Sequence, residues 1–184
     1  MKKIKLYDYQ QEMLENIIKV LTAPSPHVVR VDGKNVKQGN SGMVQMPTGT
    51  GKTFVMASVV KWFLDNYCEG EVWIVAHRRE LVEQMELTLE RFSLEYGDRE
   101  SASAATVRVR VLSIQWLTRH VESLEKTGCR PGLIVVDEAH HAIADSYQDL
   151  FVRNGQAMKL GMTATPCRMS KKSFTRLFDR LLVS

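Results

Sequence analysis

Short apolar runs alternate with longer amphipathic segments along most of this 184-residue chain. An unbroken apolar run of strand length is typical of a strand that is buried on both faces of a parallel sheet. Such runs predict strands at residues 72–76 and 133–136, and a shorter run predicts one at Met43 and Val44. The last strand is expected at residues 158–162. Because helical patterns separate these strands, we expect right-handed crossovers and an α/β domain with one open, mostly parallel sheet.

The periodicity of apolar residues predicts three helices, at residues 8–21, 53–66 and 78–94. Asp8 is the expected N-cap of the first helix. The second helix is apolar on nearly every side, so we expect other elements to cover it. The third carries a regular apolar stripe formed by Leu81, Met85, Leu89 and Phe92.

Three segments have other patterns. Residues 28–37 combine alternating valines with an Asp32-Gly33 turn, which predicts a β-hairpin. Residues 96–105 are small and polar, so we expect a loop. Valine and arginine alternate over residues 107–111, which predicts a strand with one solvated face at an edge of the sheet.

The composition is that of a globular chain of about one domain, with 44% hydrophobic residues. The longest apolar run, residues 55–64, is too short to span a bilayer, and the N-terminal segment lacks the apolar stretch of a secretory signal. The cysteines at positions 68, 129 and 167 fit no zinc spacing. They are interpreted as free thiols of a reducing compartment, so a cytoplasmic location without membrane contact is expected.

The formal net charge of +4 permits a polyanionic partner without requiring one. Basic residues gather near the C-terminal end of the chain, and a solvated helix face is the favoured interpretation of them, with contact to nucleic acid as the alternative. They are Arg168, Lys171, Lys172, Arg176 and Arg180.

The most informative stretch is residues 46–53, Met-Pro-Thr-Gly-Thr-Gly-Lys-Thr, between a predicted strand and a predicted helix. Gly49 and Gly51 can adopt backbone angles that turn successive N–H groups toward one anion, and the helix N-terminus adds its partial positive charge. Lys52 would then reach the β- and γ-phosphates, and the hydroxyl of Thr53 suits Mg²⁺. We call this stretch the phosphate cradle.

The remaining members of the phosphate cradle are expected to contact the nucleotide through their backbone; they are Pro47, Thr48 and Thr50. The usual pattern begins with glycine, where this chain has Met46. A chance glycine-rich turn before a helix is the alternative, but four matched positions at fixed spacing argue against it.

Asp137 and Glu138 follow the predicted strand at residues 133–136 directly. The carboxyl ends of parallel strands meet at one edge of the sheet, so both carboxylates should lie near the phosphate cradle. Asp137 is expected to hold Mg²⁺ beside Thr53, and Glu138 to orient and deprotonate an attacking water. As a structural alternative, the two residues could cap the following helix and complement its dipole.

The phosphate cradle followed by Asp-Glu-Ala-His resembles the nucleotide site of superfamily 2 helicases. The surrounding sequence resembles the branch that includes type III restriction subunits. Four further segments resemble motifs of that branch in the same order: Tyr9-Gln10, residues 75–81, residues 112–115 and residues 161–166. The resemblance implies a three-layer, RecA-like domain over residues 1–184 that binds ATP and Mg²⁺.

The resemblance also assigns roles to residues outside the phosphate cradle. Gln10 is expected to read the edge of the adenine base. Tyr7 and Tyr9 could frame the base, and an N-terminal hydrophobic staple is an equally good interpretation. Residues that couple hydrolysis to domain movement are expected to be His140, Thr163 and Thr165, although the two threonines could serve only as turn hydroxyls.

Arg78 and Arg79 lie at the predicted start of a helix, where the helix dipole disfavours cations. We expect this helix end and its arginines to bind a backbone phosphate of nucleic acid, with Gln115 beside them. As a structural alternative, Glu80 and Glu83 offset the two positive charges.

The favoured function is the ATP-binding half of a nucleic-acid-dependent helicase or translocase, with DNA favoured over RNA. The resemblance ends before a second RecA-like domain and its arginine finger, so we expect this chain alone to be nearly inactive. Two alternatives are a nucleotide-gated clamp without hydrolysis and a P-loop kinase of a small metabolite. The glutamate placed to activate water argues against the kinase.

Overall fold

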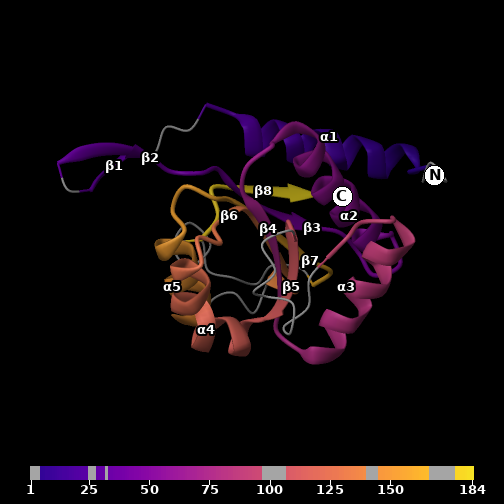
Figure 1. The fold of residues 1–184 in the computed structure, drawn as a ribbon. Helices are drawn as coiled ribbons and strands as arrows, with labels where there is room; N and C mark the ends of the chain where they lie inside the picture. The colour runs from indigo at the N-terminus through magenta and orange to yellow at the C-terminus, as the bar shows by residue number, and fades with distance from the viewer. Residues whose placement is uncertain (1–4, 25–27, 32, 97–106, 140–144, 166–176) are drawn as a thin grey trace.

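The computed structural model describes residues 5–24, 28–31, 33–96, 107–139, 145–165 and 177–184 (Figure 1). Within these residues the helices are α1 (Asp8–Thr22), α2 (Lys52–Asn66), α3 (Arg79–Arg91), α4 (Ile114–Lys126) and α5 (Asp145–Arg153). The strands are β1 (Val28–Val31), β2 (Lys34–Lys37), β3 (Ser41–Gln45), β4 (Glu71–Ala76), β5 (Val109–Ser113), β6 (Pro131–Asp137), β7 (Met158–Thr163) and β8 (Arg180–Val183).

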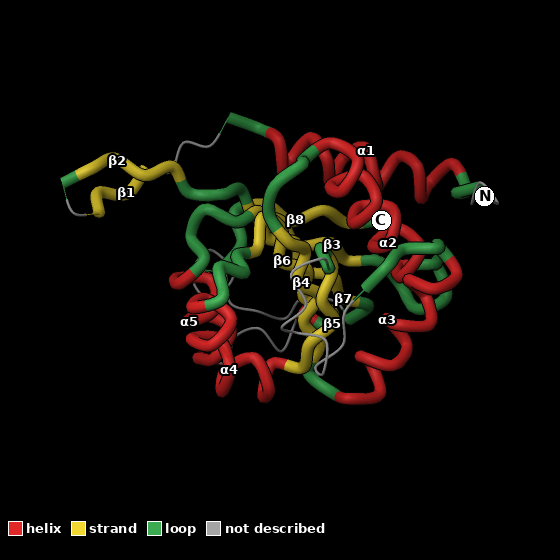
Figure 2. The backbone as a smooth tube through the Cα atoms, in the orientation of Figure 1, coloured by secondary structure: helices red, strands yellow, loops and turns green. Residues whose placement is uncertain are grey.

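Six of the strands form one sheet in the order β5-β4-β6-β7-β3-β8, and every neighbouring pair is parallel. Helices α1, α2 and α3 cover one face, while α4 and α5 cover the other, so the domain has three layers (Figure 2). This arrangement confirms the predicted α/β class and the predicted parallel sheet.

Strand β6 shows how a single strand supplies apolar side chains to both faces of the sheet. Leu133 and Val135 pack on the side of α1, α2 and α3, while Ile134 and Val136 pack on the side of α4 and α5. Successive side chains of a strand point to opposite faces, so a strand covered on both sides needs an unbroken apolar run. Burial of each such side chain contributes roughly 1.5–3 kcal/mol. Asp137 ends the run at the carboxyl edge of the sheet.

Three predicted helix boundaries were wrong. Tyr7, and not Asp8, is the N-cap of α1, and its backbone N–H donates to Oε1 of Gln10 at 3.0 Å. Arg78 is the extended N-cap of α3 and not its first helical residue. The same helix ends at Arg91 and not near residue 94, because Ser93 has a left-handed backbone with φ of 53°.

Helices α4 and α5 and strand β8 were not predicted from the sequence. Helix α4 does carry a signal, since Leu117, Val121 and Leu124 recur at helical spacing and are buried. Arg180 was predicted on a helix face but begins strand β8, because this segment pairs with β3. The other four basic residues of that prediction lie outside the described residues.

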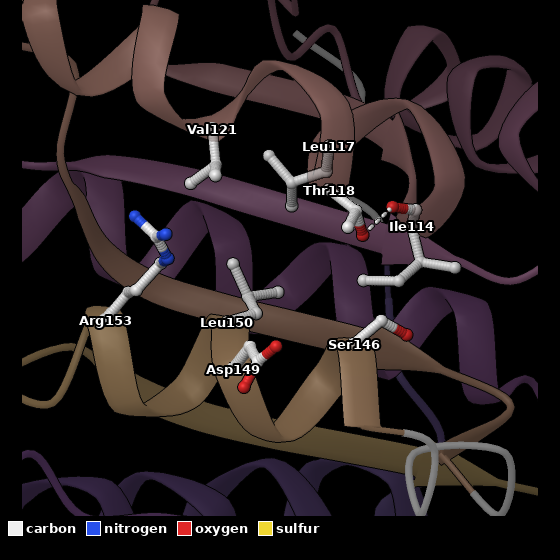
Figure 3. Close-up of a pocket in the computed structure, with 8 residues that line it drawn as sticks. All are labelled: Ile114, Leu117, Thr118, Val121, Ser146, Asp149, Leu150 and Arg153. Carbon is white, nitrogen blue, oxygen red and sulfur yellow. Dashed lines mark hydrogen bonds between the residues drawn. The ribbon is translucent and has the colours of Figure 1, made fainter.

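Helices α4 and α5 leave a small pocket of about 90 Å³ between them (Figure 3). Leu117, Val121 and Leu150 form its apolar wall, and Arg153 and Asp149 lie at its edge. Arg153 also forms ion pairs with glutamates of α4 at 3.6 and 3.7 Å. The pocket therefore lies within the α4–α5 packing, and it has room for only a few water molecules.

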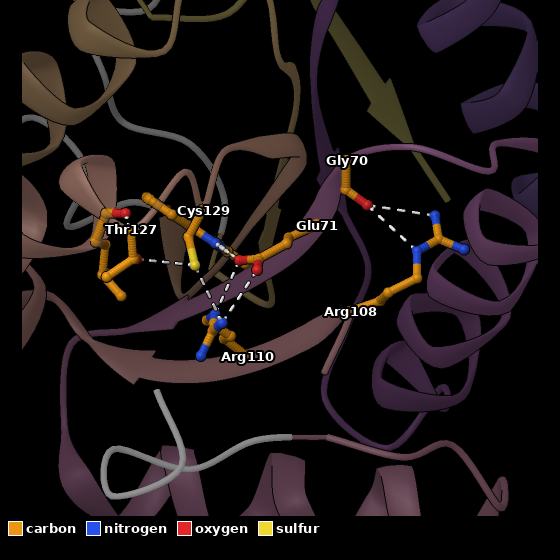
Figure 4. Close-up of polar contacts among 8 residues, drawn as sticks. Gly70, Glu71, Arg108, Arg110, Thr127 and Cys129 are labelled. Atoms are coloured by element: carbon orange, nitrogen blue, oxygen red, sulfur yellow. Dashed lines mark hydrogen bonds and ion pairs between the residues drawn. The ribbon is translucent and has the colours of Figure 1, made fainter. Parts of the chain in front are cut away.

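Strand β5 lies at the sheet edge as predicted, but the prediction of a solvated face was wrong. Arg110 is fully buried, because its guanidinium donates to Glu71 at 2.8 and 3.0 Å and to Sγ of Cys129 at 3.3 Å (Figure 4). Arg108 is half-buried and donates to the backbone oxygen of Gly70. Burial alone would raise the pKa of Glu71, but hydrogen bonds from Arg110 and Trp73 hold that pKa below its usual value.

Strands β1 and β2 pair in antiparallel register, which confirms the predicted hairpin. Cys68 and Cys129 are free thiols, and Cys167 lies outside the described residues. Among the helices of the described residues, none combines the length and apolar character needed to cross a bilayer.

A buried lysine on β7 makes the stability of the fold depend on pH. Nζ of Lys159 donates to the backbone oxygens of Gly155 and Ala157 at 3.1 and 2.9 Å. Burial lowers the pKa of Lys159 from 10.5 to about 8, although the charge of Asp179 opposes the shift. Between these two pH values the unfolded chain binds more protons than the folded one, so stability should rise with pH.

We expect the free energy of unfolding of the wild type to gain on the order of 3 kcal/mol, relative to Lys159→Met, between pH 8 and 10.5. Methionine keeps the packing of the side chain beside Phe151 and removes the titration. Denaturant titrations of both proteins across this pH range measure the difference. If the free energies of unfolding of the two proteins change with pH in the same way, Lys159 keeps its ordinary pKa in the folded protein.

Candidate functional site

The phosphate cradle is a tight turn between β3 and α2. The backbone N–H of Met46 donates to the oxygen of Thr163 at 3.0 Å, which extends the pairing of β3 with β7 by one residue. Both N–H and Oγ1 of Thr50 donate to the oxygen of Pro47, at 3.3 and 2.7 Å, and close the turn. Met46 is fully buried, so the residue in the place of the usual glycine belongs to the core.

Glycine is required at Gly51 for two reasons. This residue is the N-cap of α2 and has φ of +78°, a left-handed conformation that L side chains rarely adopt. A Cβ atom there would lie 2.2 Å from Nε2 of Gln10. Gly49 also has a left-handed backbone, with φ of +83°. The two positions give the turn that starts α2 at Lys52 and places Thr53 in its first turn, where backbone N–H groups have no intrahelical partner.

The start of α1 lies against the phosphate cradle. Nε2 of Gln10 and the hydroxyl of Tyr9 both donate to the backbone oxygen of Thr50, each at 2.9 Å. The rings of Tyr7 and Tyr9 are stacked and largely exposed, so they do not form a buried hydrophobic staple. The structure therefore places Gln10 and Tyr9 at the phosphate cradle, and the contact of Gln10 with a base stays a prediction.

Lys52 joins the phosphate cradle to the end of β6. Its Nζ lies 3.0 Å from Oε1 of Glu138 and 3.2 Å from Oδ1 of Asp137. Glu138 has φ of +52°, an uncommon conformation for a residue with a side chain, and this turn lets two consecutive carboxylates reach one ammonium group. The residues predicted to bind phosphate and to activate water are thus in direct contact.

The three charges of this cluster stabilise one another. Burial alone would lower the pKa of Lys52, but the charges of Asp137 and Glu138 more than offset it and raise that pKa. Oδ1 of Asp137 is buried and, within the described part of the chain, accepts no hydrogen bond of good geometry, so its contact with Lys52 is an ion pair. A buried carboxylate oxygen with spare capacity suits a hard cation such as Mg²⁺.

A buried tyrosine beside this cluster carried no signal in the sequence. Tyr147 of α5 is fully buried, and its hydroxyl has no hydrogen-bond partner among the residues that the structure describes. Burial raises the pKa of Tyr147, and the charge of Asp137 adds to the shift. The hydroxyl is therefore neutral and within electrostatic range of the predicted Mg²⁺ ligand.

Residues 3–168 match the model of the family described as "Type III restriction enzyme, res subunit". The chain belongs to this family. A Saccharomyces cerevisiae protein named "Putative ATP-dependent helicase IRC3" is 26% identical over 195 residues, which cover 96% of this chain and 26% of that protein. A "51.5 kDa protein" of a Lactococcus phage is 27% identical over 140 residues, which cover 76% of this chain and 27% of that protein. This chain thus spans about a quarter of the length of these relatives.

Solved structures with the same fold include two superfamily 2 cores. The Sulfolobus solfataricus SWI2/SNF2 ATPase core in complex with dsDNA has a TM-score of 0.72 at 14% identity and covers 95% of this chain and 35% of its own. The Pyrococcus furiosus Hef helicase domain has a TM-score of 0.71 at 20% identity, and the match covers 96% of this chain and 37% of that domain's chain. These likenesses confirm the RecA-like fold that the resemblance implied.

In this res-subunit domain, the residues predicted to bind nucleic acid lie near the cluster of Lys52, Asp137 and Glu138. Nε2 of Gln115, at the start of α4, donates to the backbone oxygen of His77 at 3.0 Å, next to Arg78. A hollow of about 350 Å³ is lined by His77, Arg78, Leu81 and others, and it reaches Glu138. Arg79 is exposed, and its Nε lies 3.5 Å from Oε1 of Glu83 in the same helix. One of the two arginine charges is therefore offset by a glutamate, as the structural alternative predicted.

The predicted coupling residues are only partly described. Thr163 is fully buried at the end of β7, and its Oγ1 accepts a hydrogen bond from the backbone N–H of Thr165 at 3.2 Å. Since the oxygen of Thr163 also holds Met46, this turn is attached to the phosphate cradle. His140 lies outside the described residues.

Proposed function

We propose that this chain is the ATP-binding half of a nucleic-acid-dependent ATPase that moves along or remodels DNA. The observation that carries the proposal is the cluster of Lys52, Asp137 and Glu138 at the end of the phosphate cradle. One cation and two carboxylates at the carboxyl edge of a parallel sheet supply the groups that phosphoryl transfer to water needs.

Lys52 binds the β- and γ-phosphates of ATP in this proposal. Its ammonium group is held at 3.0 and 3.2 Å from carboxylates that can keep it charged and oriented. Phosphate oxygens compete for the same ammonium protons, so nucleotide binding releases Glu138 from part of its ion pair. The left-handed turns at Gly49 and Gly51 direct the backbone of the phosphate cradle toward the same anion.

Asp137 and Thr53 would hold Mg²⁺, which neutralises charge on the phosphates when it is bound. Glu138 then acts as the general base: it accepts a proton from the water that attacks the γ-phosphorus, as the bond to the leaving ADP breaks. The contact of its Oε1 with Nζ of Lys52, at 3.0 Å, holds this carboxylate beside the proposed position of the γ-phosphate.

Nucleic acid is proposed to bind at the start of α3. Arg78 is exposed beside Gln115, at a helix end whose free backbone N–H groups favour an anion. Contacts of this kind fix position on a phosphate backbone without reading its sequence. DNA is favoured over RNA because one structural neighbour, the SWI2/SNF2 core, was solved with double-stranded DNA.

Substitutions of Lys52 and Glu138 should have different effects on the nucleotide. We expect Lys52→Ala to weaken ATP binding by roughly ten- to a hundredfold, because the phosphates lose a charge-assisted hydrogen bond. Glu138→Gln should retain binding and, in the longer protein that includes a second RecA-like domain, lower DNA-stimulated turnover by about 10²–10⁴-fold, since it removes the base. Titration with a fluorescent ATP analogue and phosphate release measure the two effects. Equal loss of binding in both variants would refute these roles. Undiminished turnover in Glu138→Gln would show that Glu138 is not the base, whereas ATP binding without turnover in the longer wild-type protein would favour a clamp without hydrolysis.

Arg78→Ala should weaken binding of unrelated DNA sequences alike. Because one phosphate contact is lost, the slope of log affinity against log salt should become shallower by about one unit. Fluorescence anisotropy at several salt concentrations measures the slope. Arg91→Ala is the matched control, since Arg91 is exposed at the other end of the same helix. Identical slopes for Arg78→Ala and the wild type would leave Arg78 with a structural role only.

A second RecA-like domain is proposed to complete the site. The charge that develops on the γ-phosphate needs stabilisation from both sides, and the residues of this chain lie on one side of the phosphate cradle. The curated relatives are about four times as long as the matched segment, which leaves ample room for such a domain.

Residues 1–184 alone should therefore bind ATP weakly and hydrolyse it barely above background. Joining the downstream part of a longer gene product should raise DNA-stimulated turnover by roughly 10³–10⁵, the range measured for inserted arginine fingers. Phosphate release with single-stranded and duplex DNA compares the two proteins. Equal turnover by both would mean that this chain contains its own finger, and the two-domain proposal would fail.

A further inference from the structure

The hairpin formed by β1 and β2 stands apart from the rest of the domain, and we call it the β-arm (residues 28–37). Its strands form a separate two-stranded sheet, and each makes its main contacts with the other. Figures 1 and 2 both show it extending away from the three-layer body. An isolated two-stranded hairpin is only marginally stable in water, so a binding partner would stabilise the β-arm.

The base of the β-arm is fixed to the body. The backbone N–H of Gly39 donates to the oxygen of Gly155 at 2.8 Å, and a Cβ atom at Gly39 would lie 2.1 Å from the oxygen of Ala157. The side-chain amide of Asn40 donates to the oxygen of Leu21 at 3.1 Å, at the end of α1. The close backbone approach and the amide hydrogen bond position the arm relative to β3, which begins at the next residue.

The side chains of the β-arm are those of a polyanion-binding surface. Arg30, Lys34 and Lys37 are all exposed, and the only acidic residue in this part of the sequence is Asp32. Within the described part of the chain, none of the three cations has a carboxylate within salt-bridge distance.

The strand register places two of the three cations, Arg30 and Lys37, on one side of the β-arm. Arg30 lies opposite Asn35, and Val28 lies opposite Lys37, so these four residues share a face. Lys34 lies beside the turn at the tip. Two cations and an amide on one face, with a third cation at the tip, present several hydrogen-bond donors to a ligand.

We propose that the β-arm is a second contact site for duplex DNA, where its cations bind backbone phosphates and its two strands lie along the major groove. The inference rests on the proposed nucleic-acid function. The major groove of B-DNA admits a two-stranded β-ribbon, whereas the deep, narrow major groove of A-form RNA does not. Arginine and lysine contacts to phosphates fix position and carry no sequence information, so the contact is independent of sequence.

The test compares three variants of the full chain by fluorescence anisotropy with a labelled 25-base-pair duplex at several salt concentrations. The first replaces Arg30, Lys34 and Lys37 by alanine. The second preserves charge, with Arg30→Lys, Lys34→Arg and Lys37→Arg. The matched control replaces three exposed lysines on other elements by alanine, namely Lys19, Lys61 and Lys126.

We expect the alanine variant to bind the duplex about tenfold or more weakly at low salt, with a salt slope shallower by two to three units, because up to three phosphate contacts are lost. The charge-preserving variant should keep the wild-type slope, and the control should change it by less than one unit. Binding of a fluorescent ATP analogue and the melting temperature should be the same in all variants, which shows that each is folded.

If the alanine variant has the same slope of log affinity against log salt as the wild type, or as the control, the β-arm proposal is wrong. The proposed function of the domain would still stand. An equal loss with single-stranded DNA or duplex RNA overturns the assignment of the ribbon to the groove of duplex DNA. If the wild type binds ATP but no nucleic acid of any kind, the proposed function and the β-arm proposal both fail.

Discussion

The ion cluster of Lys52 with Asp137 and Glu138 is the contact on which the rest of the site depends. It joins the first residue of α2 to the end of β6, although β7 separates β6 from the cradle strand β3 in the sheet. Part-buried charges of this kind are costly unless they are paired, so the positions of β3, β6 and α2 must agree closely for the cluster to form. The apolar core supplies that agreement, because both strands are buried on both faces and a shift of either would have to repack the side chains of both closely packed layers.

The fold class and the phosphate cradle could be predicted because their signals are local. An apolar strand, two glycines at fixed positions and an apolar helix lie within one short stretch, and Gly51 has the left-handed backbone that the motif requires. Arg110 shows where such reasoning fails. Alternation of valine with arginine indicates a solvated face only if the arginine has no buried partner, and Glu71 is 39 residues away in the sequence. Pairing at that distance left no trace in the periodicity.

The same limit applies to the surroundings of the nucleotide site. Gln10 was assigned to the base on resemblance alone, but in the structure its amide bridges the start of α1 and the oxygen of Thr50. The left-handed turn at Glu138 and the buried hydroxyl of Tyr147 also have no sequence signature, because each depends on elements that meet only in the folded domain. Local motifs thus predict which residues would carry the chemistry, while the tertiary fold decides what holds them in place.

The placement of the β-arm and the phosphate cradle at opposite ends of β3 limits how DNA can influence ATP. A strand of five residues spans roughly 16 Å, twice the distance over which exposed charges are screened at physiological salt. Charge on a duplex held by the β-arm therefore has little direct effect on the γ-phosphate. Coupling between DNA on the β-arm and ATP at the phosphate cradle would therefore be mechanical. The bound duplex would set the orientation of this domain relative to a second RecA-like domain. The arm would then help to position the DNA for the motor without taking part in the hydrolysis of ATP.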